Sequence, residues 1–302
     1  MPSFKPIQIE DKEAITRYTY PSNRLNCDFA FANMCIWRFL YKSEYAIHDQ
    51  FLFIRFYIEE KNRRRLAYMF PVGDGDLQQA IRYIEKDAET LHHPLLILGI
   101  TPTEKSRLNA LYDAHFTYIT ERDYFDYIYL HEDLITLAGK KYQPKRNHIN
   151  KFKKQYDYTY LPITQDIISE CMKLEQIWYE DNKAEDNNEN IFYERCSMRF
   201  AMEHFEALGL LGGAIVVDHE IIAFTYGSPI NHHVFGVHTE KADIRFDGAF
   251  SVINQEFAKH IPQQYSFINR EEDLGIPGLR KSKLSYHPHL LLEKYAAIRR
   301  TF

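Results

Sequence analysis

Apolar and polar residues alternate along the first half of the chain in a pattern that predicts strands and helices in turn. A helix is expected after Asn26-Cys27-Asp28, because Phe29, Asn33 and Ile36 recur there at helical spacing. Asp76 is placed to cap a second helix. The expected elements are a helix from 29, strands at 45–58 and 66–72, a helix at 76–91, a strand at 95–100, a helix at 103–115 and a strand at 123–130.

The second half of the chain repeats this order of helices and strands. A tight turn at 218–220 joins two of its strands into a hairpin. The expected elements are a strand at 158–162, helices at 166–182 and 192–208, strands at 211–217, 221–228 and 233–239, a helix at 248–261, a strand at 265–269, a helix at 278–285 and a strand at 291–298. Hairpins followed by alternating strands and helices predict an α/β (α+β) protein with mixed sheets.

Length and charge narrow the class of protein. The chain has 302 residues, 45% of them hydrophobic, so two domains with ordinary cores are expected. Its net charge of -5 argues against coating nucleic acid by bulk charge. The start shows no signal peptide, and no segment offers about twenty uninterrupted apolar residues. The four cysteines form no CxxC pair, which favours reduced thiols and a cytoplasmic location.

One candidate binding segment is the sequence HTEKADIRFDGAF, residues 238–250, between a predicted strand and a predicted helix. Gly248 and Ala249 stand where the helix begins, so backbone N–H groups and the helix dipole could attract a phosphate there. Arg245 would add a charged hydrogen bond. An ordinary strand-to-helix turn is the alternative.

A second candidate segment, INREEDLGIPGLRKSKLSYHP at 268–288, follows a predicted buried strand. Asn269 and Arg270 could contact the donor, and Glu271, Glu272 or Asp273 could accept a proton or hold an ammonium group. On the following helix, Arg280 and Lys283 could hold anions, and the phenol of Tyr286 could act as a general acid. A solvated charged loop and a basic helix face are the alternative.

The only strongly basic segment lies between the halves, at residues 137–156. Its cations could meet an RNA backbone, a nucleotide phosphate or an anionic membrane surface. A solvated linker helix explains the same charges. The candidate donor-binding residues of this segment are Lys140, Lys141, Lys145 and Arg146.

Several common functions have no motif in this sequence. The histidine pairs lack the spacing of metal ligands, so no metal is expected. The chain has no GxSxG, Walker or repeated GxGxxG motif, which removes the usual hydrolase, P-loop and dinucleotide-binding interpretations. Gly73 and Gly75 stand among acids that would repel phosphate, so the N-terminal half is expected to be structural.

The segments GKKYQPKRNHINKFKK, INQEFAK and above all INREEDLGIPGLRKSKLSYHP resemble a family matching the C-terminal domain of bacterial phosphatidylglycerol lysyltransferases. The resemblance spans nearly the whole chain. It implies two tandem GNAT-like (GCN5-related N-acetyltransferase-like) domains, each a mixed, mostly antiparallel sheet flanked by helices. The expected boundaries are an N-terminal domain at 1–136, a basic linker helix at 137–156 and a C-terminal, active domain at 157–302.

The resemblance also implies transfer of an acyl or aminoacyl group. Arg245, Gly248 and Phe250 match the Q/R-x-x-G-x-G/A motif that holds the pyrophosphate of coenzyme A in GNAT enzymes, although Phe250 replaces a small residue. The lysyltransferase relatives take their aminoacyl group from tRNA and deliver it to a lipid. The expected donor is therefore aminoacyl-tRNA or an acyl-coenzyme A thioester, and peripheral contact with anionic lipid is open. The alternative is a non-catalytic module that binds RNA or an anionic ligand.

Overall fold

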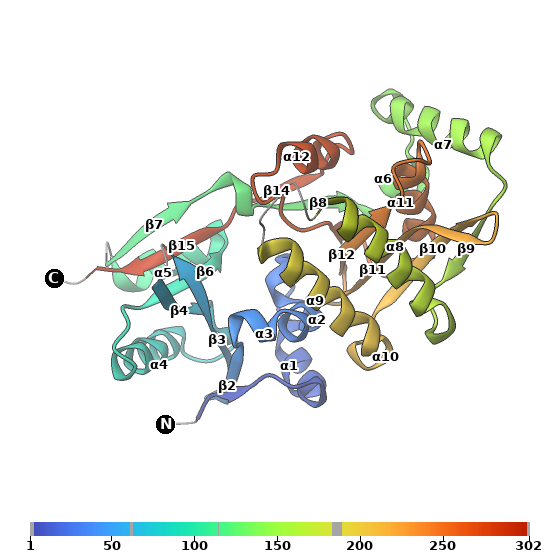
Figure 1. The fold of residues 1–302 in the computed structure, drawn as a ribbon. Helices are drawn as coiled ribbons and strands as arrows, with labels where there is room; N and C mark the ends of the chain where they lie inside the picture. The colour runs from blue at the N-terminus through green and yellow to red at the C-terminus, as the bar shows by residue number, and fades with distance from the viewer. Residues whose placement is uncertain (1–2, 61–62, 114, 183–188, 301–302) are drawn as a thin grey trace.

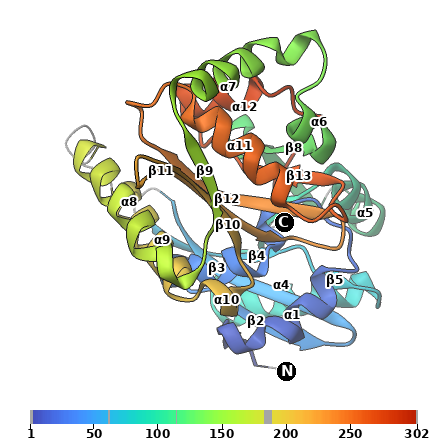
Figure 2. The same cartoon turned by 90° about the vertical axis from the view of Figure 1, so that its right-hand side faces the viewer.

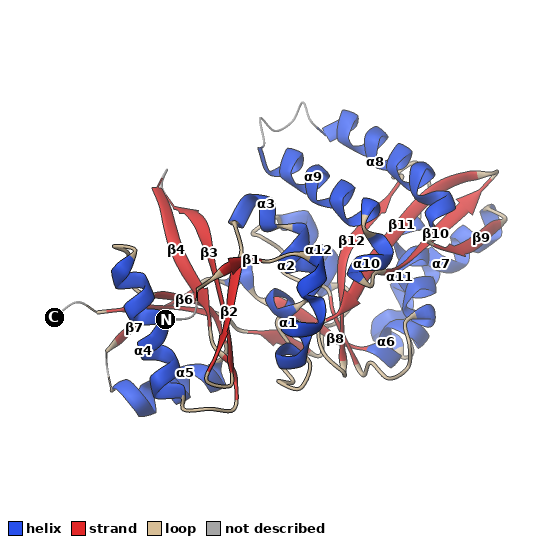
Figure 3. Ribbon diagram, turned by 90° about the horizontal axis from the view of Figure 1, so that it is seen from below, coloured by secondary structure: helices blue, strands red, loops and turns tan. Residues whose placement is uncertain are grey.

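The computed structural model describes residues 3–60, 63–113, 115–182 and 189–300. Its strands form two sheets at opposite ends of the molecule, and helices from the N-terminal part of the chain lie between them (Figure 3). These helices are α1 (Lys12–Thr19), α2 (Phe31–Ile36) and α3 (Arg38–Tyr41). Short 3₁₀ helices are η1 (Ile9–Asp11), η2 (Cys27–Phe29), η3 (Arg122–Tyr124), η4 (Lys140–Tyr142) and η5 (Gln165–Ile167).

The first sheet has the strand order β1-β2-β3-β4-β6-β15-β7, with β5 paired to β3. Its only parallel pair among the described strands is β4 with β6. Helices α4 (Leu77–Thr90) and α5 (Pro102–Tyr112) supply part of its core. As predicted, the Asp76 carboxylate caps α4 by accepting hydrogen bonds from the backbone N–H groups of Gln78 and Gln79. The strands are β1 (Lys5–Pro6), β2 (Glu44–His48), β3 (Phe51–Glu60), β4 (Arg63–Met69), β5 (Val72–Gly73), β6 (Leu96–Ile100), β7 (Phe116–Thr120) and β15 (Tyr295–Arg299).

The second sheet has the order β14-β8-β13-β12-β11-β10-β9. One face packs on α6 (His131–Thr136), α7 (Gln143–Gln155) and α11 (Ala249–His260), and the other on α8 (Ile168–Asn182), α9 (Glu189–Glu203) and α10 (Phe205–Leu208) (Figure 2). Its strands are β8 (Asp126–Leu130), β9 (Tyr158–Pro162), β10 (Leu211–Val217), β11 (Glu220–Pro229), β12 (Val234–Ala242), β13 (Phe267–Asn269) and β14 (Leu290–Leu292), and α12 (Pro277–Leu284) lies between β13 and β14 in sequence.

The two sheets exchange strands across the predicted domain division. Strand β8 precedes residue 136 but pairs with β13 and β14 of the second sheet. Strand β15, near the C-terminus, pairs with β6 and β7 of the first sheet (Figure 1). The predicted single strand at 291–298 is therefore wrong, since β14 and β15 belong to different sheets. An apolar run indicates that a strand is buried but does not indicate which sheet buries it.

Two further differences concern the first sheet. The predicted strand at 45–58 is a hairpin of β2 and β3, because Asp49 and Gln50 adopt left-handed backbone conformations with φ of 45° and 65°. Such a pair of positive φ angles makes the tight turn that suits twisted strands. Strand β7 was not predicted. The hairpin at 218–220 is confirmed, with positive φ at Asp218 and His219.

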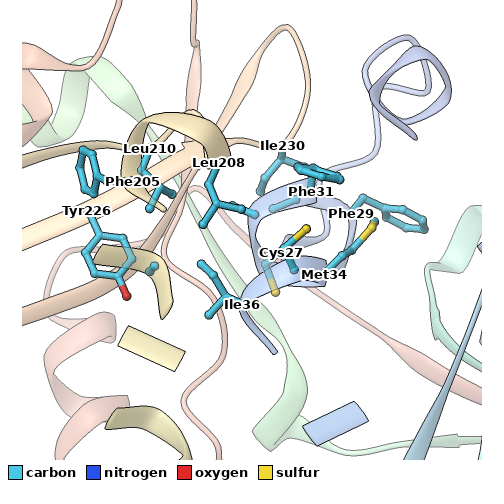
Figure 4. Close-up of a cluster of buried hydrophobic side chains, with 14 of the residues drawn as sticks. Cys27, Phe29, Phe31, Met34, Ile36, Phe205, Leu208, Leu210, Tyr226 and Ile230 are labelled. Atoms are coloured by element: carbon cyan, nitrogen blue, oxygen red, sulfur yellow. The ribbon is translucent and has the colours of Figure 1, made fainter. Parts of the chain in front are cut away.

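A shared core joins the two halves. Phe31 and Met34 of α2 belong to the same buried apolar cluster as Phe205, Leu208 and Ile230 from the second half (Figure 4). Burying each such side chain contributes roughly 1.5–3 kcal/mol. The N-terminal half therefore forms part of the scaffold around the second sheet. The predicted fold class, an α/β (α+β) protein with mixed sheets flanked by helices, is confirmed. No described helix has the length and apolar character needed to cross a bilayer.

Candidate active site

The candidate site is built where β12 and β13 separate. These strands run parallel for three residue pairs, ending at Gly236 and Asn269. Beyond Asn269 the backbone enters a turn in which Glu271 and Leu274 adopt positive φ of 57° and 51°. The side chains that follow β13 therefore point in different directions, and each meets different partners.

Glu271 lies between the two halves of the chain. Its Oε1 accepts a hydrogen bond from Nδ2 of Asn33 on α2 at 2.7 Å and lies 2.8 Å from Nδ1 of His238 on β12. Its side chain keeps 21% of its surface exposed. A carboxylate that is held in place and still partly exposed has the geometry of a general base.

Glu272 belongs to a buried ion cluster. The Lys294 ammonium contacts Glu272 and lies 2.8 Å from Asp126 Oδ1 and 3.1 Å from Asp28 Oδ2. Burial raises the pKa of Asp126 to about 7 although Lys294 opposes it, whereas attraction to Lys294 outweighs burial at Glu272 and lowers its pKa. The side-chain atoms of Cys27, Asp28 and Glu272 that could bind a metal ion lie within 4.8 Å of one another. The Lys294 ammonium contacts all three of these side chains, where a metal ion would otherwise bind.

Asp273 is fully buried and saturated with donors. Its carboxylate accepts from Arg280 at 2.7 and 2.9 Å, from Arg122 at 3.2 Å and from the Tyr127 hydroxyl at 2.6 Å. Burial alone would raise the pKa of Asp273, but the hydrogen bonds from Arg280 and Tyr127 outweigh it and hold the pKa well below its usual range. The geometry therefore favours a structural anchor and does not favour a proton acceptor at Asp273.

Arg270 points to the opposite face of the sheet, toward α7. The guanidinium donates through Nη2 to Glu240 Oε1 at 3.0 Å and lies 5.0 Å from the centre of the Tyr286 ring. Its Nη1 is a buried atom without a hydrogen-bond partner. The ammonium of Lys145, on α7, lies 3.9 Å from the centre of the same ring. Arg270 and Lys145 thus bring two positive charges to one phenol.

Burial shifts the pKa values of Tyr286 and Lys145. It raises the pKa of Tyr286 to about 12, so the phenol stays protonated at neutral pH. Tyr286 is only 3% exposed, and this does not favour the predicted role as general acid. Burial, with repulsion from Arg270, lowers the pKa of Lys145 to about 8.

The expected phosphate loop at the start of α11 is occupied by protein contacts. The Arg245 guanidinium pairs with Asp243, two residues away, at 2.5 to 3.0 Å. The Ala249 N–H donates to the Phe246 carbonyl. Gly248 has φ of +96°, and a Cβ built there would lie 2.9 Å from the His148 carbonyl oxygen on α7. Helix α7 thus covers the position where a pyrophosphate was expected, so the geometry does not favour that loop.

A basic cavity of about 510 Å³ opens instead between α7 and α12. Lys141 and Lys145 line it from the basic segment, and Lys281 lines it from α12. The full lining is Lys141, Pro144, Lys145, His148, Gly278, Lys281, Ser282, Ser285 and His287. Lysines and histidines with serine hydroxyls are donors suited to phosphate oxygens. The two basic stretches singled out in the sequence therefore meet, but away from Arg245.

Other predicted ligand-binding residues make internal contacts. Lys283 donates to the Arg270 and Glu272 carbonyls, and Arg280 binds Asp123 and Asp273. Asn269 donates to the Leu25 carbonyl and to Asp126 and accepts from the Glu271 N–H. Arg146 holds the carbonyls of Leu137 and Gly139. Lys140 is exposed. These contacts fix the turn after β13 and the entry to α7, and do not favour direct donor binding by Lys283, Arg280, Asn269 or Arg146.

The cavity and the site also contain residues that the sequence did not single out. Ser282, Ser285 and His287 line the cavity beside Lys281 and His148, which belong to the basic stretches already noted, and Asn33 and His238 contact Glu271. The four-residue spacing of Lys281 on α12 and Ser285 at its C-terminal cap was an available signal. His238 gave no comparable signal, since its partner Glu271 lies far away in sequence, in the turn after β13.

The sequence relates this chain to a family of lysyltransferase C-terminal domains. The model of the family "Phosphatidylglycerol lysyltransferase, C-terminal" matches residues 20–298, and the chain belongs to that family.

Several solved structures share the fold of this chain. A conserved protein of unknown function from Bacteroides thetaiotaomicron VPI-5482 is 49% identical, with a TM-score of 0.96 over 99% of this chain and 100% of that one. L-PGS from Bacillus licheniformis is 14% identical, with a TM-score of 0.67 over 99% of this chain and 94% of that one, and FemX is 9% identical with a TM-score of 0.64 over 97% and 96%. At these lower identities the likeness concerns the fold.

An uncharacterized protein of Mycoplasmoides gallisepticum (strain R(low / passage 15 / clone 2)) is 24% identical over 204 residues, 67% of this chain. The match spans 64% of that relative's length.

Proposed function

We propose that this chain is an acyl- or aminoacyltransferase that moves its group from a phosphate-bearing donor, aminoacyl-tRNA or acyl-coenzyme A, to an amine or hydroxyl acceptor. The observation that carries the proposal is the basic cavity between α7 and α12 in a chain of the phosphatidylglycerol lysyltransferase C-terminal family. Lys141, Lys145 and Lys281 are placed to bind donor phosphates.

Glu271 is the base in this proposal. It takes the proton from the attacking amine or hydroxyl as the new C–N or C–O bond to the donor carbonyl carbon forms. The C–O bond of the ester or the C–S bond of the thioester then breaks, and the proton passes to the leaving oxygen or sulfur. A positioned base of this kind contributes typically about 10²–10⁴-fold to a rate.

The geometry is compatible with donors of this class. Arg270 lies beside Lys145 and Tyr286 on the cavity side of the sheet, and the next residue, Glu271, contacts His238 and Asn33 on the other side. In aminoacyl-tRNA and acyl-coenzyme A the reactive carbonyl is at one end of a long molecule. In this proposal the donor phosphates therefore bind in the cavity while the donor carbonyl lies at Glu271.

The test is turnover of each donor. Purified protein is incubated with radiolabelled aminoacyl-tRNA or with acyl-coenzyme A, with a lipid extract and a mixture of amines as acceptors. The expected result is release of free tRNA or free thiol above the rate without protein, reduced at least about 10²-fold in Glu271→Gln. Release of neither product in wild type would contradict the proposal.

The second candidate is a binding module for RNA or an anionic ligand, favoured by the exposed cations of α7 such as Lys151 and Lys154. A module that contacts several phosphates would lose affinity steeply with salt and release no product. Saturable, salt-sensitive tRNA binding without deacylation would select this candidate.

A further inference from the structure

Three polar side chains, those of Ser228, His238 and Glu271, form a hydrogen-bonded line that ends at the exposed carboxylate of Glu271. Ser228 Oγ on β11 lies 2.7 Å from His238 Nε2, and His238 Nδ1 lies 2.8 Å from Glu271 Oε1. The Ser228 residue is 2% exposed and the His238 side chain 4%, whereas the Glu271 side chain is 21% exposed. Only the carboxylate end of this line therefore faces outward to any extent.

For a neutral imidazole beside an ionised carboxylate, the two hydrogen bonds fix which ring nitrogen carries the proton. An ionised carboxylate only accepts, so Nδ1 of a neutral His238 must carry the proton that it donates to Glu271. Nε2 is then an acceptor, and the Ser228 hydroxyl donates to it. A histidine held at both nitrogens has one tautomer and one ring orientation.

The backbone is shaped to hold this histidine. In the pairing of β11 with β12, Tyr226 faces Thr239 and Gly227 faces Val237, so His238 is the extra residue of a β-bulge. Bulges re-aim a side chain and are common beside active sites.

Two glycines make room for the bulge. A Cβ at Gly227 would lie 2.0 Å from the Gly236 carbonyl oxygen, which no side chain can tolerate. A Cβ at Gly236 would lie 3.1 Å from Cε1 of the His238 ring. Larger residues at 227 or 236 would displace His238.

Glu271 is also held under strain. Its φ of 57° is rare for a non-glycine residue, and its N–H donates to Asn269 Oδ1 at 2.6 Å. Such a conformation costs of order 1–3 kcal/mol and persists only where the surroundings impose it. Asn33 adds a second hydrogen bond to the oxygen that faces His238. Both halves of the chain thus orient one carboxylate.

We propose that His238 and Ser228 are positioning residues, which hold the Glu271 carboxylate in the orientation that the transfer reaction needs. The inference rests on the proposed function, in which Glu271 is the base. His238 keeps Oε1 of Glu271 in place, and Ser228 keeps the His238 ring in place. Ser228 is too buried to meet a substrate, so it acts through His238.

The arrangement is tested without activity by NMR of protein labelled with ¹⁵N-histidine. The expected His238 spectrum shows a protonated Nδ1 and an unprotonated Nε2. Glu271→Gln should remove this preference, because the amide can donate to Nδ1 as well as accept from it. A mixture of tautomers in wild type, or an Nε2–H form, would overturn the inference whatever the protein catalyses.

Kinetics with charged tRNA or acyl-coenzyme A as the probe then tests the role. His238→Ala should lower kcat by about 10²-fold with KM nearly unchanged, the effect of a misplaced group. His238→Asn, whose amide can donate from the place of Nδ1, should recover about 10-fold of that loss. Ser228→Ala should lower kcat less than His238→Ala. The control is His219→Asn in the exposed β10–β11 turn, which should match wild type.

The outcomes separate the two proposals. A wild type without turnover contradicts the proposed function and leaves the NMR result to decide the arrangement. Turnover that is unchanged in His238→Ala overturns the positioning role while the proposed function stands. A covalent acyl adduct on Ser228 in intact-mass analysis would also overturn it, because Ser228 would then be a nucleophile.

Discussion

Replacing Lys294 by Met should destabilise the protein strongly, because Lys294 is a buried cation that contacts several acids. The residue is 7% exposed, and its ammonium contacts Asp28, Asp126 and Glu272. Removing one partner of a buried ion pair costs about 3–5 kcal/mol, since the remaining charge is uncompensated. Methionine fills a similar length, so the loss reflects charge more than volume.

The assay is urea unfolding at pH 8 and at pH 5, followed by tryptophan fluorescence. Burial already raises the pKa of Asp126 to about 7 with Lys294 present, and removal of the ammonium should raise it further. When an acid has a higher pKa in the folded than in the unfolded protein, the free energy of unfolding falls as pH rises from the unfolded pKa to the folded pKa. The penalty of the mutation should therefore be larger at pH 8 than at pH 5, where the carboxyl groups can take up protons.

The matched control is Lys154→Met, which removes an exposed ammonium of α7 and should change the free energy of unfolding by less than about 0.5 kcal/mol. A Lys294→Met penalty below about 1 kcal/mol, or one that is larger at pH 5 than at pH 8, would refute this account of the cluster.

Three further predictions concern single residues. Gly248→Ala should lower the free energy of unfolding by about 1–2 kcal/mol in urea titrations because of its φ of +96°, whereas Gly278→Ala, with open space for a Cβ, should be neutral or stabilising; equal effects of the two substitutions would contradict this reasoning. Inorganic pyrophosphate should bind about 10-fold more weakly at pH 9 than at pH 7 by calorimetry, because Lys145, with a pKa of about 8, loses its charge, and Lys145→Ala should abolish this dependence. Asp76→Ala should cost about 1 kcal/mol by removing the cap of α4, measured as a lower Tm, and an unchanged Tm would count against the cap.

Local signals made most of the fold predictable. The Asp76 cap and the apolar runs of β10 to β12 depend on residues close in sequence, and the structure has them as predicted. The exchange of β8 and β15 depends on pairing between distant segments, which hydrophobic periodicity does not encode.

The candidate site was predictable in part for the same reason. Lys141 and Lys145 were found from a local excess of charge, and they line the cavity. Arg245 looked suitable for a phosphate, but Asp243 two residues earlier binds it, and α7 covers Gly248. The contact of His238 with Glu271 follows from a β-bulge and a parallel register. Neither feature is visible in one sequence.

The most direct test of the proposed function is to measure kcat and KM for whichever donor the wild type turns over. The two proteins to compare with wild type are a double Lys145→Ala/Lys281→Ala variant and Glu271→Gln. The double variant should raise KM for the donor with little change in kcat, because both lysines line the cavity in which we propose that the donor phosphates bind. Glu271→Gln should lower kcat by at least about 10²-fold with KM nearly constant. Unchanged KM in the first variant together with unchanged kcat in the second would contradict the account.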